Sequence, residues 1–245
     1  MKVWTNIIFL MLCLFIQGCD DSRITNKLSK SDGIDLTVKV PSGLVSLPLN
    51  VMYRSNDCKQ DRINAKGEVY DVPGFKKIIP SPSSSRNDGA LNYQIPIALS
   101  GVCNWAVSNV TVVLQVDNRN LGLVENIPSE IILSFDENPP QVSNGLSENI
   151  TSDGVVHRVY YPMLTRRYIG GNKTIVSLFD GNTNFTYNAK GLSKITYAPD
   201  FFESNVVERD SPRIHGGDFT IKYSDGTILK DGSIYPDIDK LNSIN

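Results

Sequence analysis

Apolar and polar residues alternate with a period of two along much of this chain. Residues 34–40 (IDLTVKV) place four aliphatic side chains on one face and three polar side chains on the other, as in a half-buried β-strand. Residues 109–116 (NVTVVLQV) are apolar and rich in valine, which is typical of a central strand. The same reasoning predicts further strands at residues 47–54, 92–99, 130–135, 155–161, 174–179, 184–188, 194–198, 219–223 and 227–230. Helical periodicity is weak throughout, so the pattern predicts an all-β chain of sandwich type.

The residues between these stretches indicate how the strands are grouped. Asp180-Gly181 and Asp225-Gly226 each lie between two predicted strands, and such dipeptides favour β-hairpins. Residues 136–154 are polar and contain two adjacent prolines, which indicates a boundary. We therefore predict two β-sandwich-like domains, at residues 34–140 and 150–245, with a single merged sheet structure as the alternative.

The N-terminal residues follow a different pattern. Lys2 precedes a run of about ten apolar residues, Ile7 to Ile16, which is too short to span a bilayer core. A positive start followed by a short apolar run and small residues predicts a signal peptide at residues 1–18. The polar residues 19–33 are predicted to form a flexible tether.

The end of this signal resembles the lipobox of bacterial lipoproteins. Ile16-Gln17-Gly18-Cys19 stands where cleavage is expected, and the resemblance implies that Cys19 is lipidated and anchors the tether to a membrane. Asp20 and Asp21 resemble the acidic residues that retain enteric lipoproteins at the inner membrane, although they fit the start of a polar tether equally well. We therefore expect a periplasmic protein anchored to the inner membrane, with the outer membrane as the alternative.

The remaining cysteines predict a cross-link. Cys13 is removed with the signal and Cys19 is lipidated, which leaves Cys58 and Cys103 as an even pair in an oxidising compartment. We therefore predict a Cys58–Cys103 disulfide. The chain has only two histidines, His157 and His215, which lie far apart, so no metal site and no cofactor are expected.

The sequence gives little indication of catalysis or nucleic-acid binding. The formal net charge is −2, whereas nucleic-acid binding favours a strongly basic face. The usual hydrolase, nucleotide-binding and zinc-protease motifs are absent. His215, flanked by glycines and close to Asp218, is the best candidate for a general base, but a loop histidine is the favoured interpretation. His157 is interpreted as a partly buried strand histidine, and the chain is predicted not to be an enzyme.

Two groups of residues predict a binding loop and a core position. Arg166, Arg167 and Tyr168 lie in a predicted turn, and arginine and tyrosine are favoured at binding hot spots, so we predict a partner-binding loop there. Trp105 follows Cys103 by two residues, and we predict that its indole helps to fill the sandwich core beside the disulfide rather than stacking on a ligand.

One region resembles a known group of proteins. The cysteine pair brackets Gly67-Glu68-Val69-Tyr70 and residues 93–97 (YQIPI), and residues 103–105 (CNW) and 108–110 (SNV) follow. Residues 55–116 thereby resemble lipoproteins encoded near type VI secretion effectors, which include periplasmic immunity proteins against antibacterial phospholipases. The resemblance implies a membrane-anchored immunity protein whose partner is a secreted toxic effector. The alternative is a structural or assembly lipoprotein of the envelope or of a secretion machine.

Overall fold

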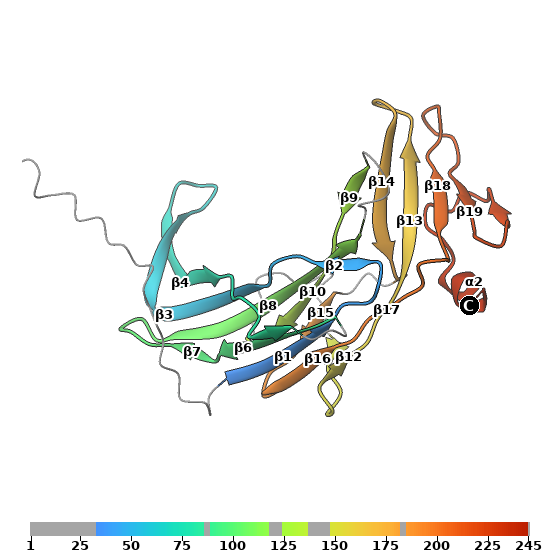
Figure 1. Cartoon of the computed structure of the whole chain (residues 1–245). Coiled ribbons are helices and arrows are strands. Elements are labelled where there is room, and N and C mark those ends of the chain that lie inside the picture. Colours follow the sequence, from blue (N-terminus) through green and yellow to red (C-terminus); the bar gives the residue numbers. More distant parts are fainter. Residues whose placement is uncertain (1–32, 86–88, 118–123, 137–147, 182–184, 245) are drawn as a thin grey trace, which may run out of the picture.

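The described residues fold into three β-sheets and one short helix (Figure 1). The structure, a computed structural model, describes residues 33–85, 89–117, 124–136, 148–181 and 185–244. The predicted all-β, sandwich-like class is confirmed. The predicted signal peptide, Cys19, Asp20, Asp21 and the tether as far as residue 32 lie outside the described residues. Within the described part of the chain, no helix is long and apolar enough to cross a membrane.

Sheet A combines antiparallel and parallel pairs. Its five strands, in spatial order, are β12 (Val155–Val156), β16 (Lys194–Tyr197), β1 (Gly33–Lys39), β6 (Ala90–Pro96) and β5 (Ser84–Ser85). The first strand that the alternation predicts, β1, pairs antiparallel with β6 and parallel with β16. Its aliphatic side chains Ile34, Leu36 and Val38 are buried, as the period of two requires.

Sheet B is the largest sheet. Its main path runs through β11 (Glu148–Asn149), β15 (Thr186–Asn188), β10 (Ser129–Ser134), β8 (Trp105–Val116), β3 (Asn50–Ile63) and β4 (Val69–Ile78). Two short strands, β2 (Leu44–Ser46) and β7 (Ala98–Leu99), also pair with β8. Consequently β8 lies at the centre of this sheet, which agrees with its apolar, valine-rich sequence.

Sheets A and B share one hydrophobic core. Alternate residues of β8, among them Val110, Val112 and Leu114, are buried together with the inward residues of β1. The hydroxyl of Tyr53 in β3 donates a hydrogen bond to the carbonyl of Pro96 in β6 over 2.9 Å. This bond joins the two layers near the start of β1, because Gly33 lies opposite Pro96.

Sheet C lies at the opposite end of the molecule from β4 (Figure 1). It contributes to a second, smaller hydrophobic core. Its path runs through β20 (Ile228–Leu229), β19 (Thr220–Lys222), β18 (Val207–Asp210), β13 (Val159–Arg167), β14 (Lys173–Phe179) and β9 (Glu125–Ile127), and β17 (Asp200–Phe201) also pairs with β13. Helix α2 (Ile238–Ser243) begins after Asp237, whose carboxylate accepts hydrogen bonds from two backbone N–H groups of the helix. Its residue Leu241 is buried against Tyr161 and Met163.

Each sheet takes strands from both sides of the boundary predicted at residues 136–154. Strands β12 and β16 complete sheet A, β15 extends sheet B, and β9 joins sheet C. The ranges 34–140 and 150–245 therefore share their sheets. Parallel partners such as β1 and β16 are far apart in sequence, and no local pattern encodes their pairing.

The two predicted hairpin turns have different outcomes. Asp225-Gly226 does connect β19 to β20 in an antiparallel pair, and the φ of Gly226 is 86°. The prediction at Asp180-Gly181 is wrong, because β14 belongs to sheet C and β15 to sheet B. A Cβ atom at position 181 would lie 2.9 Å from Cβ of Ile238, so the glycine allows the start of α2 to approach the turn.

Candidate functional site

A long hairpin formed by β3 and β4 stands away from the sandwich (Figure 1). The two strands pair from Val51 and Ile78 at the base to Ile63 and Val69 near the tip. In contrast, β8 pairs with β3 only as far as Arg54. The burial of alternate residues in β3 ends at the same place, so the outer half of the hairpin has solvent on both faces.

A bulge in β3 marks the point where the hairpin leaves the sheet. The register of β3 against β4 shifts between Ser55 and Lys59. The buried Ser55 holds this bulge: its Oγ accepts hydrogen bonds from the backbone N–H groups of Asp57 (3.1 Å) and Cys58 (2.9 Å). The same hydroxyl donates to the carbonyl of Cys103. One buried side chain therefore fixes both the bulge and the neighbouring loop.

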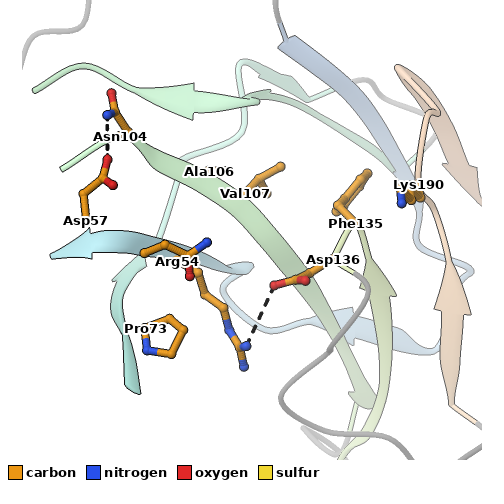
Figure 2. Close-up of a pocket in the computed structure, with 10 residues that line it drawn as sticks. Arg54, Asp57, Pro73, Asn104, Ala106, Val107, Phe135, Asp136 and Lys190 are labelled. Carbon is orange, nitrogen blue, oxygen red and sulfur yellow. Dashed lines mark hydrogen bonds and ion pairs between the residues drawn. The ribbon is translucent and has the colours of Figure 1, made fainter. Parts of the chain in front are cut away.

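The predicted disulfide between Cys58 and Cys103 is confirmed, and it lies at this bulge. It joins β3 to the loop before β8 with a Cα–Cα distance of 5.2 Å. The side-chain amide of Asn104 donates a hydrogen bond to Oδ2 of Asp57 over 2.6 Å, as Figure 2 shows. Asn104 has a φ of 46°, a left-handed conformation that asparagine tolerates better than most residues. The base of the hairpin is therefore braced by covalent and polar links to one loop.

The opposite strand passes this brace at close range. A Cβ atom at Gly74 of β4 would lie 2.0 Å from the carbonyl oxygen of Cys58 and 3.3 Å from the indole of Trp105. Only a residue without a side chain fits there. Trp105 itself is partly buried and packs against the core of sheets A and B, as the sequence predicts.

A groove runs along the hairpin beside the bulge. The groove encloses about 720 Å³ and is lined by Met52, Arg54, Arg62, Ile63, Tyr70, Val72, Pro73 and Phe75. Several of these apolar side chains are well exposed: Ile63 by 71%, Tyr70 by 48% and Phe75 by 45%. The guanidinium of Arg62 lies 5.8 Å from the centre of the Phe75 ring, within cation–π range. We call this feature the hairpin groove.

A second hollow continues the hairpin groove towards sheet B. It encloses about 540 Å³ and shares Arg54 and Pro73 with the groove (Figure 2). Arg54 points towards Asp136, and the two charged groups lie 3.8 Å apart. The combined surface offers cations, aromatic rings and aliphatic side chains, which suit it to binding.

The sequence-predicted binding residues lie elsewhere, on sheet C. The prediction that all three occupy a turn is wrong for Arg166 and Arg167, which end strand β13. Nη1 of Arg166 donates hydrogen bonds to Glu208 (2.9 Å) and Asp210 (3.3 Å) of β18. The hydroxyl of Tyr168 also donates to Asp210 over 3.3 Å.

These contacts bring Arg166 and Tyr168 together and leave Arg167 apart. The hydrogen bonds to Glu208, and secondarily to Asp210, raise the pKa of Arg166 above its ordinary value. The guanidinium of Arg213 lies 4.5 Å from the Tyr168 ring centre. Arg167 is exposed and, because neighbouring strand residues alternate, faces away from Arg166. We call Arg166, Tyr168, Glu208, Asp210 and Arg213 the sheet C cluster.

The two histidines are not arranged as catalytic groups in the described structure. His157 is exposed, which overturns the expectation of a partly buried strand histidine, because Val156 and Arg158 take the buried positions beside it. Its Nε2 lies 2.8 Å from Oδ2 of Asp200. His215 is exposed and forms no hydrogen bond with Asp218 or a serine within the described residues. Nor do the described residues bring together three or more His, Cys, Asp or Glu side chains in a way that could hold a metal ion.

The sequence did not predict the hairpin groove, although it did predict the disulfide at the base of the hairpin. Residues 56–63 lack alternation because both faces of the outer hairpin are solvated, so the pattern did not predict a strand there. A local signal was present in residues 69–78, where Pro73-Gly74 interrupts a strand-like run. No family model, curated protein or solved structure matches this chain.

Proposed function

We propose that this protein is a periplasmic, lipid-anchored immunity lipoprotein that binds and neutralises a toxic effector of the type VI secretion, phospholipase kind. The observation that carries the proposal is the braced hairpin, which presents Arg62, Tyr70 and Phe75 to solvent from a fixed base. Residues 55–116, on which the resemblance to immunity lipoproteins rests, include the outer hairpin and both cysteines. Neutralisation by occlusion needs affinity and shape rather than chemistry.

A fixed hairpin suits tight binding for an energetic reason. Side chains and loops that become ordered on association lose about 0.5–1.5 kcal/mol per immobilised side chain, and pre-ordering reduces this loss. The disulfide, the hydrogen bonds of Ser55 and the close passage of Gly74 all restrict the hairpin before any partner arrives. Arginine and tyrosine at its surface are the residue types that most often dominate binding energy.

The position of the hairpin also agrees with a membrane anchor at Cys19. The first described residue, Gly33, lies opposite Pro96, whose carbonyl accepts the hydrogen bond from Tyr53 just before the bulge. Strand β1 therefore starts at the end of the sandwich that carries the hairpin. Residues 19–33 span at most about 50 Å when fully extended. An anchored protein would hold its hairpin within reach of the bilayer surface, where a phospholipase acts.

The proposal is tested by competition between bacterial cells. Target cells that make the wild-type protein should survive attack by cells that deliver the effector encoded beside its gene, whereas target cells without the protein should not. Equal killing of both targets would contradict the immunity function and favour the alternative of a structural or assembly lipoprotein.

The sheet C cluster remains a second proposed contact surface. Arg166→Ala with Tyr168→Ala should weaken protection while the abundance of the protein stays normal, if this cluster contacts the effector. Full protection by the double variant would remove the cluster from the binding surface without affecting the proposed function, because the hairpin lies at the other end of the molecule (Figure 1).

A further inference from the structure

The hairpin groove is lined by two arginines and by apolar side chains, which together favour one kind of ligand. We infer that it receives an acidic segment of the effector, with a carboxylate at Arg62 and an aromatic or aliphatic side chain between Tyr70 and Phe75. This inference rests on the proposed function, because it names the part of the partner that the hairpin binds. It is carried by the charge and the exposed apolar area of the groove.

The groove face is basic. Arg54 and Arg62 line it. Among the described residues, none with a carboxylate lines the hairpin groove. Arg62 forms no ion pair within the described part of the chain, and its guanidinium lies over the Phe75 ring. Its guanidinium therefore remains available for a carboxylate, with which arginine forms paired, charge-assisted hydrogen bonds.

The second arginine is only loosely engaged. Arg54 lies 3.8 Å from Asp136, and both side chains remain about 30% exposed. An exposed pair at this distance contributes little on its own. A carboxylate that enters the groove can therefore interact with Arg54 as well as with Arg62.

Two neighbouring carboxylates of the outer hairpin lie outside the lining of the groove. Asp61 of β3 and Asp71 of β4 are directly opposite one another, and alternation places them on the face away from the Arg62–Tyr70 pair. Two like charges in one cross-strand pair are unfavourable for the sheet itself. Lys59, which pairs directly with Pro73, does not line the groove either. The charged side chains that do line it are therefore both arginines, which attract acidic groups.

The groove also has room and apolar surface for a side chain beside the carboxylate. Its volume of about 720 Å³ is within the range of ordinary ligand pockets. Met52, Val72 and Phe75 supply aliphatic and aromatic walls. Because the rings of Tyr70 and Phe75 are half exposed, covering them with an apolar group removes their area from water.

The inference is tested with two fluorescent synthetic peptides of equal length and the full chain in detergent. The acidic peptide carries aspartates and glutamates around a phenylalanine and a leucine, and the basic peptide has lysine at each acidic position. The acidic peptide should bind and the basic peptide should not, as measured by fluorescence anisotropy. Arg62→Glu should weaken the acidic peptide by about thirtyfold, the scale of a hot spot. Phe75→Ala, which keeps every charge, should weaken it as well.

Lys59→Glu is the matched control, because it makes the same change of charge on the same hairpin at a residue that lines neither hollow. It should retain wild-type affinity, and unfolding curves of all three variants should show that they are folded. Absence of binding by the acidic peptide, equal binding of both peptides, or equal losses in Arg62→Glu and Lys59→Glu would each overturn the inference. The outcome is separable from that of the proposed function, because wild-type protection in cell competition is scored without reference to the groove.

Discussion

Removal of the Cys58–Cys103 disulfide should destabilise the whole protein and loosen the hairpin in particular. The appropriate variant is Cys58→Ala with Cys103→Ala, which leaves no free thiol. The two cysteines are separated by 45 positions, for which the chain-entropy model gives a loss of about 4 kcal/mol. The slope of the unfolding free energy against urea should also increase, because the unfolded chain without the cross-link exposes more surface.

The local effect can be separated from the global one. Ser55→Ala keeps the disulfide but removes the acceptor of two backbone N–H groups and the donor to Cys103. It should cost about 1–3 kcal/mol, because buried polar groups lose their partners. Urea unfolding gives the global loss for each variant, and amide hydrogen exchange of residues 56–73 reports the hairpin. A loss below about 1 kcal/mol in the cysteine variant, with unchanged exchange in the hairpin, would refute the role of the brace.

Three further predictions test other parts of the account. Gly74→Ala places a methyl group 2.0 Å from the carbonyl of Cys58, so it should destabilise the protein by about 1–3 kcal/mol in urea unfolding, and wild-type stability would contradict the close passage. Burial raises the pKa of Tyr187 to about 12 from its ordinary value of 10.0. The unfolded chain therefore loses this proton first, and stability should fall as the pH rises between these two values. Urea unfolding across this range should show a shallower fall in Tyr187→Phe, and an identical fall would contradict it. Cys19→Ser should abolish acylation and leave an unprocessed precursor, and continued incorporation of labelled palmitate would show that the lipobox interpretation is wrong.

The sequence predicted those strands that have one face in the core. In β1 and β8, alternate residues meet the other sheet, so burial imposes a period of two on the residue types. The cysteine count also predicted the disulfide, because two cysteines remained for the oxidising compartment that the sequence analysis expected, which left one pairing. These features depend on local pattern or on simple exclusion.

The features that make the candidate site depend on other forces. Residues 56–63 have no buried face, so nothing in their pattern reveals that they continue β3. Their conformation depends on β4, on Ser55 and on the disulfide, which are set by contacts distant in sequence. Likewise Arg166 was expected in a turn because basic and glycine residues cluster there, whereas Glu208 and Asp210 of a distant strand hold it at the end of β13.

The central claim is that the groove face of the braced hairpin binds and neutralises an effector. The most direct measurement compares the survival of target cells that make wild-type protein, Arg62→Glu or Lys59→Glu at equal periplasmic abundance, during attack by effector-producing cells. Wild-type protein and Lys59→Glu should protect fully, and Arg62→Glu should protect poorly, because Arg62 lines the groove and Lys59 does not. Equal protection by Arg62→Glu and the wild-type protein would contradict the claim.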